Sequence, residues 1–345
     1  MVAWTQASHC GGIAGAASTT KTVEYTAMSS GNNSFVLHRT AAVGQWRTCV
    51  KPAGGGLWTL VTDLELTVEM QPSFMPLVGI AGSVTPLTFT NSSDEDLVVL
   101  QEGNCSNAHL VVTGAAALGR TVVKGASVST VISMGSAAVL RVCYATRESG
   151  GDSADDYTQL SAMFVQRVPV SFSPMRTVTG AQQEFAVLQT TSGDHVAWTQ
   201  AVSCAATNGG ATGSKTVEYT SNVRSGSQTT AYFTLHASTN VGTWTTCMKP
   251  TGGLWTKITG VVLQIFAQPS FAPPIGVAGM VTPIVFYGSV DGDFVVMQSQ
   301  SCTGAHQAHT GAHALGKSVV ANHQVSTHVN MTETAQLRMC YATQE

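Results

Sequence analysis

The stretch LRVCYATRE, residues 140–148, returns almost unchanged as LRMCYATQE, residues 337–345, 197 residues further along the chain. Three other stretches also recur. VAWTQASHC from Val2 returns as VAWTQAVSC from Val196, VGQWRTCVKPAGGGLWT from Val43 as VGTWTTCMKPTGGLWT from Val241, and QPSFMPLVGIAGSVTPLTF from Gln71 as QPSFAPPIGVAGMVTPIVF from Gln268. Self-similarity at a fixed period is the sequence signature of a repeat architecture. One unit of about 197 residues therefore occurs nearly twice.

The repeat unit divides again into two halves of related layout. VSFSPMRTVTG from Val170 aligns with PSFMPLVGIAG in the other half, and each half carries one pair of cysteines. We therefore predict four modules, at residues 1–70 (type A), 71–167 (type B), 168–267 (type A) and 268–345 (type B). Eight cysteines allow 105 pairings, but the repetition leaves one simple pairing. It joins Cys10 to Cys49, Cys105 to Cys143, Cys204 to Cys247, and Cys302 to Cys340.

Within a module the local pattern is that of β-strands. In the second module, short runs rich in Val, Leu, Thr and Phe alternate with clusters of Gly, Ser, Asn and Asp, and no stretch has a sustained helical period. We count about seven strands per module, which is typical of an antiparallel immunoglobulin-type sandwich. The predicted fold is all-β, a tandem array of disulfide-bridged immunoglobulin-like β-sandwiches. Each bridge closes a loop of about 40 residues and should stabilise its module by roughly 3–4 kcal/mol.

The strand LRVCYAT and the later tyrosine of DDYTQL resemble the repeated immunoglobulin-like modules of very large protist surface and flagellar-hair proteins of the mastigoneme type. This resemblance spans the whole chain through short motifs. It implies the architecture and a structural role, and it transfers no functional residues.

The terminal modules are expected to be incomplete. Aligned on the repeat, Met1 corresponds to His195, so the first module lacks the equivalent of its first strands. Glu345 corresponds to Glu148, so the last module lacks the final strand that YTQLSAMFV provides from Tyr157. Open sheet edges are normally avoided. Either the chain is a segment of a longer array, or neighbouring molecules supply the missing strands by β-augmentation.

Composition excludes several classes of partner. Charged residues make up only 10% of the chain and the formal net charge is -3, so no basic patch is available for nucleic acid or an anionic membrane. No apolar run is long enough for membrane insertion. Eight paired cysteines predict an oxidising, extracellular or cell-surface location. The N-terminal stretch has no secretory-leader pattern, so we expect that a leader was removed or lies upstream.

Two clusters could bind a metal ion, but we predict no cofactor. Histidines gather at His306, His309 and His313, yet the second module retains only His109 at the matching positions, and loop histidines are usually just solvated. Acidic loops offer oxygen ligands for calcium without matching a known calcium-loop spacing. These residues are Glu148, Asp152, Asp155 and Asp156 in one loop, and Asp94, Glu95 and Asp96 in another.

Two further features concern glycans. Sequons predict N-glycosylation at Asn32, Asn91 and Asn330, whereas the sequon at Asn104 adjoins a bridge cysteine. The six tryptophans recur in register in the type A modules and are interpreted as core residues beside the bridge. The alternative is an aromatic platform for sugars, with Trp58 and Trp255 as the most exposed pair. The tryptophans are Trp4, Trp46, Trp58, Trp198, Trp244 and Trp255.

The sequence shows no nucleophile accompanied by a base, and no pair of carboxylates at the same place in each repeat. Nothing in it therefore indicates catalysis. The sequence predicts a non-enzymatic structural repeat protein in an extracellular filament, flagellar hair or surface coat. Its expected partners are neighbouring modules of the same protein, through self-association, and glycans. The alternative is a cell-surface adhesion or carbohydrate-binding protein.

Overall fold

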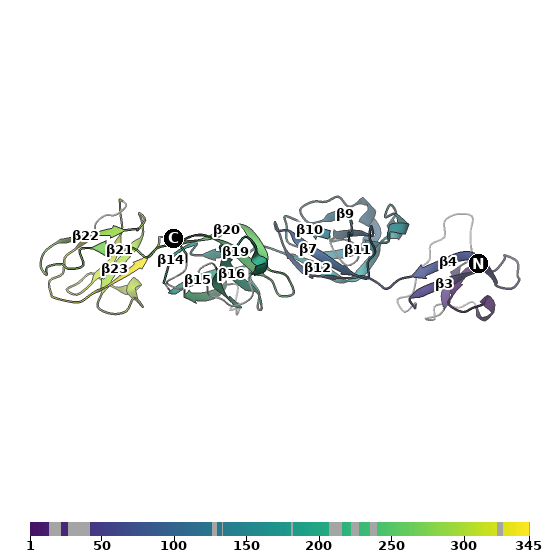
Figure 1. The fold of residues 1–345 in the computed structure, drawn as a ribbon, viewed down its shortest axis with the longest axis horizontal. Coiled ribbons are helices and arrows are strands. Elements are labelled where there is room, and N and C mark those ends of the chain that lie inside the picture. The colour runs from purple at the N-terminus through teal and green to yellow at the C-terminus, as the bar shows by residue number, and fades with distance from the viewer. Residues whose placement is uncertain are drawn as a thin grey trace. The chain divides into compact units, whose positions relative to one another are not determined.

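The secondary structure of the chain is β, as predicted (Figure 1). The computed structural model describes residues 1–13, 22–26, 42–125, 130–132, 134–180, 182–206, 216–221, 228–234, 240–322 and 327–344. The helices among these residues are short 3-10 turns. They are η1 (Cys10–Gly12), η2 (Cys105–Leu110), η3 (Arg147–Ser149), η4 (Ala154–Asp156), η5 (Cys204–Ala206) and η6 (Ala305–Gln307).

The residues of module 2 form two sheets, with strand orders β10-β7-β5 and β6-β12-β11-β8-β9. The bounds are β5 Ser73–Met75, β6 Val78–Ile80, β7 Thr85–Thr90, β8 Leu97–Gln101, β9 Leu118–Val122, β10 Thr130–Ile132, β11 Ala138–Ala145 and β12 Thr158–Arg167. The sequence pattern missed β6. This strand is only three residues long and is separated from β5 by Pro76, and it pairs in parallel with the end of β12.

Module 3 repeats this topology strand for strand, with orders β13-β15-β18 and β14-β20-β19-β16-β17. The bounds are β13 Ser171–Ser173, β14 Arg176–Val178, β15 Gln182–Leu188, β16 His195–Thr199, β17 Thr216–Ser221, β18 Gln228–Thr234, β19 Gly242–Lys249 and β20 Thr256–Phe266. Again the short second strand, β14, pairs in parallel with the last strand, β20. The two sandwiches confirm that the half-repeats share one fold.

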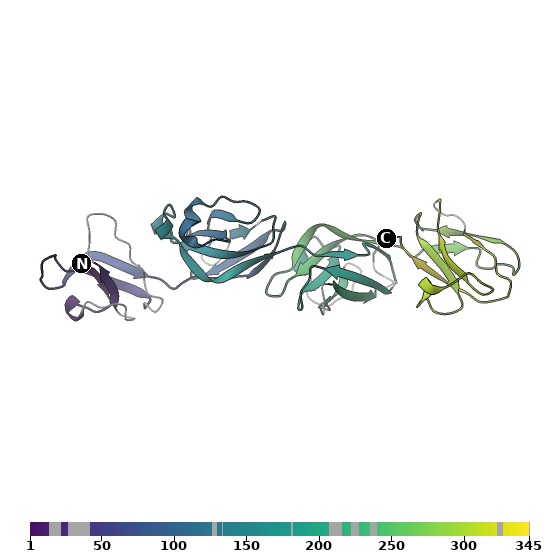
Figure 2. The same ribbon diagram turned by 180° about the vertical axis from the view of Figure 1, so that it is seen from behind.

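The described parts of modules 1 and 4 hold fewer strands. Module 1 contributes one sheet of order β2-β1-β3-β4, and module 4 contributes two, of orders β21-β22-β25 and β24-β23-β26. The labelled strands of module 4, β21, β22 and β23, share one range of colour in Figure 1, and Figure 2 shows the same ribbon from behind. The bounds are β1 Val2–Thr5, β2 Thr22–Thr26, β3 Gly44–Val50, β4 Thr59–Val68, β21 Ser270–Ala272, β22 Thr282–Tyr287, β23 Phe294–Gln298, β24 Leu315–Val319, β25 Thr327–Val329 and β26 Arg338–Ala342.

Aromatic side chains fill the core between the sheets of module 3. Trp198 and Trp244 are fully buried, and the ring of Trp198 lies 5.1 Å from that of Phe172 and 4.9 Å from that of Phe185. These contacts bring together β13, β15 and β16, strands that belong to different sheets. Alternation of inward apolar and outward polar residues along each strand is what makes such a core possible.

The four disulfides have the pairing that the repeat predicts. Their Cα–Cα distances are 5.9 Å for Cys10–Cys49, 5.5 Å for Cys105–Cys143, 5.7 Å for Cys204–Cys247 and 5.4 Å for Cys302–Cys340. In module 2 the bridge ties η2, between β8 and β9, to β11 of the same sheet. Antibody domains instead join their two sheets. The architecture is therefore immunoglobulin-like, with a different bridge.

Contacts between Cα atoms divide the chain into two compact units. The first is Met1–Met75, Pro86–Val131 and Val139–Phe164, and the second is Pro76–Thr85, Ile132–Ala138 and Val165–Glu345. No helix among the described residues has the length and apolar character needed to cross a bilayer.

Candidate functional site: buried aspartates and a module joint

A buried aspartate precedes the same strand in three modules. Asp96 precedes β8, Asp194 precedes β16 and Asp293 precedes β23, and each is at most 1% exposed. In each case one carboxylate oxygen accepts a hydrogen bond from the backbone N–H three residues earlier, at 2.6–2.8 Å. The other accepts one from a backbone N–H just beyond the strand that holds the second bridge cysteine, at 2.9–3.0 Å. Each aspartate thus joins a turn to a distant strand end.

The third donor to these carboxylates differs between module types. In the type B modules a tyrosine hydroxyl donates to the carboxylate, from Tyr144 to Asp96 and from Tyr341 to Asp293. In module 3 the position of this tyrosine is taken by Met248, which has no donor. Instead, the guanidinium of Arg167 contacts both oxygens of Asp194 at 2.8 Å.

The charge state of these groups follows from burial and partners. Burial, together with the hydrogen bond to Asp96, raises the pKa of Tyr144, and the same causes act on Tyr341 with Asp293. Burial alone would raise the pKa of Asp194, but Arg167 and the N–H groups of Thr191 and Thr251 outweigh it, so the pKa is lowered. Asp194 is therefore an ionised, buried carboxylate that depends on a neighbouring cation.

That cation comes from the preceding module. Arg167 is the last residue of β12 in module 2, and its side chain is 16% exposed whereas that of Asp194 is 0% exposed. Arg167 also donates to the carbonyl oxygen of Gln189, at 3.4 Å. An isolated buried charge is costly unless it is paired and hydrogen-bonded. Without the end of module 2, the buried carboxylate of Asp194 in module 3 would therefore lack its cationic partner.

One backbone bridge and one hydroxyl hydrogen bond accompany the ion pair, all within the second compact unit. Val78 of β6 forms a parallel bridge with Gly253, and the hydroxyl of Ser83 donates to the carbonyl oxygen of Lys257 at 3.0 Å. A Cβ atom on Gly253 would lie 2.8 Å from the ring of Pro250 and 3.1 Å from the carbonyl oxygen of Val78, so a side chain at this position would be crowded from both sides. We give the name joint to the set Val78, Ser83, Arg167, Asp194, Gly253 and Lys257.

A related contact joins the next pair of modules. Arg176 is the counterpart of Val78 on the repeat, and its carbonyl oxygen accepts a hydrogen bond from the hydroxyl of Thr343 at 3.1 Å. Thr343 in turn is the counterpart of Pro250, in the segment after the bridge strand. The Arg176 guanidinium lies 4.9 Å from the ring centre of Phe266, which replaces Arg167 at the end of its strand. The segment after the bridge strand thus contacts the preceding module in both pairs, through different residues, and among the described residues the ion pair is seen only at the joint.

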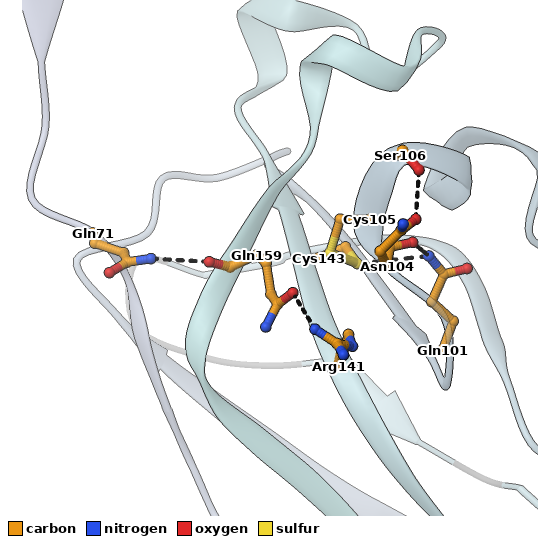
Figure 3. The surroundings of a disulfide bond; sticks show 8 residues. All are labelled: Gln71, Gln101, Asn104, Cys105, Ser106, Arg141, Cys143 and Gln159. Carbon is orange, nitrogen blue, oxygen red and sulfur yellow. Dashed lines mark hydrogen bonds between the residues drawn. A yellow bond between two sulfur atoms is a disulfide. The ribbon is translucent and has the colours of Figure 1, made fainter. Parts of the chain in front are cut away.

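Polar residues surround the bridge of module 2 (Figure 3). The amide of Gln101 donates to the carbonyl oxygen of Asn104, and the guanidinium of Arg141 donates to the side-chain oxygen of Gln159 at 2.8 Å. Gln71 donates to the backbone oxygen of Gln159 at 3.3 Å. These hydrogen bonds hold η2, β11 and β12 in place beside the bridge. All eight cysteines are in disulfides, so none is a free thiol.

The histidines of module 4 lie at the surface. His306, His309 and His313 are exposed, and Nε2 of His313 contacts a carboxylate oxygen of Glu333 at 2.7 Å. In the part of the chain that is described, no three His, Cys, Asp or Glu side chains converge on a possible metal position. The nearby His323 lies outside the described residues.

The acidic loops have structural partners instead of a common centre. Asp152 contacts Arg120 at 2.5 Å. Asp156 caps η4 by accepting a hydrogen bond from the N–H of Ser153 at 2.8 Å, and Asp155 lies in the first turn of the same helix. The oxygens of Asp96 are buried and accept hydrogen bonds from the backbone N–H groups of Ser93 and Arg147.

The tryptophans behave as core residues. Trp46, Trp198 and Trp244 are fully buried. Trp58 and Trp255, expected to be the most exposed pair, are half-buried and pack against the cystines of their own modules. Trp4 packs beside Trp46.

The sequons at Asn91 and Asn330 are accessible. Both asparagines are exposed, and Asn91 adopts a left-handed backbone with φ 59° in a turn. Asn104 is exposed too, but its side-chain oxygen accepts from the hydroxyl of Ser106 in the same sequon. Asn32 lies outside the described residues.

Sequence reasoning missed the buried aspartates as a set. The signal was available, since an Asp follows a turn in SSDEDLVV, TTSGDHVAW and SVDGDFVVM at equivalent positions of three modules. The partner of Asp194 had no such signal, because Arg167 occupies a position that no other module fills with arginine.

No family model matches the chain, and no curated protein matches it. Solved structures that resemble it include SGBP-B of the Bacteroides ovatus mixed-linkage glucan utilization locus, in complex with a mixed-linkage heptasaccharide (7% identity, TM-score 0.22, 77% of this chain and 62% of that one). Others are Escherichia coli alpha-2-macroglobulin activated by porcine elastase (12%, 0.20, 85% and 31%) and the BSP domain of a biofilm associated protein (14%, 0.19, 56% and 29%). The chain thus spans less than two thirds of each of these structures. Such distant likenesses assign no function to it.

Proposed function

We propose that the chain is a structural segment of an extracellular filament or surface coat, in which disulfide-bridged sandwiches act as spacers. The observation that carries the proposal is the joint, where a buried carboxylate of module 3 takes its cation from module 2. In the next pair of modules, the hydroxyl of Thr343, in the segment after the bridge strand, donates to the carbonyl oxygen of Arg176, the counterpart of Val78. A spacer benefits when the stability of one module depends on its neighbour, and the pairing of Arg167 with Asp194 supports such a dependence.

The extracellular location is supported by cysteine usage. All eight cysteines form disulfides, and such bonds persist in oxidising compartments. A flagellar hair is one assembly of this kind, and the resemblance of the LRVCYAT motif to protist modules is its basis. The adhesion or carbohydrate-binding alternative has less support, because Trp58 and Trp255 pack against the bridges and do not form an open platform.

The proposal is tested by measuring whether the joint orders two modules. Dyes carried by unnatural amino acids at Val112 and Val202, which are 82% and 99% exposed, would report the distance distribution by single-molecule energy transfer. We expect a narrow distribution that broadens in Arg167→Met. The matched control is Tyr144→Phe, which removes the donor to Asp96 without touching the joint and should leave the width unchanged.

A broad distribution in the unmodified chain would contradict the spacer role. The assembly itself is tested by sedimentation and electron microscopy of the chain alongside a glycan array. Ordered association supports the filament proposal, whereas a monomer with saturable glycan binding supports the adhesin.

A further inference from the structure

In modules 2 and 3, a short strand near the start of the module pairs in parallel with the end of its last strand. In module 3, Arg176–Val178 of β14 lie beside Gln264–Phe266 of β20. In module 2, Val78–Ile80 of β6 lie beside Val165–Arg167 of β12. We call each of these strand pairs the clamp of its module. The chain that enters a module is thus bonded directly to the chain that leaves it.

Main-chain hydrogen bonds lie at both ends of each clamp. In module 3 the N–H of Gln264 donates to the carbonyl oxygen of Met175 at 2.8 Å. At the other end, the N–H of Thr179 donates to the carbonyl oxygen of Phe266 at 2.9 Å. The equivalent bonds in module 2 are 2.8 and 2.7 Å long. The same arrangement therefore occurs in two modules whose side chains differ.

Side chains add to the clamp of module 3. Thr177 of β14 and Ile265 of β20 are each 1% exposed. The guanidinium of Arg176 lies 4.9 Å from the ring centre of Phe266, and a cation over an aromatic face is attracted to it. The two strands of this clamp are therefore held together by buried residues and by a cation–π contact as well as by the main chain.

The parallel direction decides how tension acts on these strands. Because β14 and β20 run the same way, the N-terminal end of the one and the C-terminal end of the other lie at opposite ends of the clamp. Tension that enters the module first meets β13, whose three residues pair with β15, and then reaches β14. It then slides β14 along β20 and loads all of their hydrogen bonds at once. A hairpin pulled from its open end would instead lose its bonds one at a time.

The disulfide of module 3 closes a loop that contains neither strand of the clamp. Cys204 and Cys247 are 43 residues apart, with β14 before this loop and the clamp end of β20 after it. The bridge between Cys105 and Cys143 lies between the two strands of its clamp in the same way. When a clamp opens, the residues outside the loop are free to extend, whereas the bridge keeps the loop closed.

We propose that the clamp and the bridge together form a tension-limiting device in each of these modules. The clamp sets the force at which the module yields, and the disulfide sets the length that it then releases. A module built in this way lengthens by a limited step. This inference rests on the proposed spacer role, since only a chain held at both ends loads the clamp in this direction.

The test pulls on module 3 within the full chain, in optical tweezers. Handles are attached through unnatural amino acids at Val168, which is 45% exposed, and at the exposed Gln268. The load therefore enters before β13 and leaves after β20. We expect one main unfolding step. In a variant with Cys204→Ser and Cys247→Ser, the step should be longer by about 150 Å, because a loop of 43 residues is released at up to ~3.6 Å per residue.

Two variants at one position isolate the clamp. Thr179→Pro removes the N–H that donates to Phe266. Proline suits this position, because Gly180, with φ 73°, follows it in a turn. Thr179→Ala keeps the N–H and is the matched control. At the same force, Thr179→Pro should unfold about 5- to 10-fold faster than Thr179→Ala, the effect of losing one main-chain hydrogen bond.

A third variant separates the clamp from overall stability. Ile258→Val changes a buried residue of β20 outside the clamp. It should lower stability in urea by an amount comparable to Thr179→Pro, but it should change the rate of forced unfolding much less. If Thr179→Pro does not fold, as judged by amide exchange in β16, Ala81→Pro is the equivalent change in module 2, with handles at Gln71 and Val168.

Other results would overturn the proposal. Equal rates of forced unfolding for the proline and alanine variants would exclude the clamp, and so would an equally large effect of Ile258→Val. A step of the same length with and without the bridge would exclude the role of the disulfide. The spacer role is judged separately, by the energy-transfer distances and by assembly. A chain that assembles but has no clamp effect would therefore lose this inference and keep the spacer role.

Discussion

Replacing Arg167 with methionine tests the central electrostatic argument. The substitution keeps an unbranched apolar stem at the end of β12 and removes the guanidinium that contacts both oxygens of Asp194 at 2.8 Å. The carboxylate remains fully buried, and it keeps the N–H donors of Thr191 and Thr251.

The expected cost follows from what is left behind. Removing one partner of a buried ion pair costs about 3–5 kcal/mol. Because two backbone donors remain and the Arg167 side chain is 16% exposed, we expect the lower end, about 3 kcal/mol, for module 3. In a domain of this size that lowers the melting temperature by roughly 10–20 °C.

The dependence on pH gives a second signature. The folded-state pKa of Asp194 is below its ordinary value, so its contribution to stability is present above about pH 4 and is lost as the pH falls toward the folded pKa. Without Arg167, burial dominates and the carboxyl is easier to protonate. The difference between the two proteins should therefore shrink as the pH is lowered through about 4.

The assay is a urea titration followed by hydrogen exchange in peptides from β16 and β20, which report module 3 separately. A rescue variant combines Arg167→Met with Met248→Tyr, since tyrosine donates to the aspartate at this position in modules 2 and 4. It should restore the stability of module 3. It should not narrow the distribution of distances between the dyes at Val112 and Val202. A loss under about 0.5 kcal/mol, typical of surface changes, would refute the reasoning, and so would a loss that is equal at pH 3 and pH 7.

Three further outcomes are expected. Replacing Cys204 and Cys247 together by serine should lower the free energy of unfolding of module 3 by about 4 kcal/mol for its loop of roughly 40 residues, measured by urea titration; an unchanged value would contradict the structural role of the bridge. Burial and Lys249 lower the pKa of His195, so stability should fall as the pH drops below about 6.5, and His195→Gln should flatten that part of the pH–stability curve. Secretion from a eukaryotic host should add a glycan at the exposed Asn91, removable by Asn91→Gln and detected by intact mass; identical masses would argue against occupancy.

Much of the fold is encoded locally and is readable from the repeats. The alternation of apolar residues in AVLRVCYA predicts β11 at its observed bounds, Ala138–Ala145, because strand periodicity depends only on neighbouring residues. The pairing of Cys105 with Cys143 also follows, since one pair per repeat leaves few alternatives. The short strand β6 was missed because three residues carry too little periodicity.

The candidate site is a different case. A recurring Asp is visible in the sequence, but the donor to Asp194 is Arg167, in the preceding module, where the type B modules use a tyrosine of their own. That Arg167 donates to Asp194 depends on the end of β12 lying beside the start of β16 in the folded chain.

The sequence by itself therefore determined the period, the β-class, the four bridges and the division into two module types, because each rests on spacing along the chain. Only the tertiary structure decided that Asp96 is a buried structural anchor whose oxygens accept hydrogen bonds from protein donors, and that Trp255 packs on its cystine. These properties depend on burial and on partners distant in sequence, which are defined only once the strands are assembled.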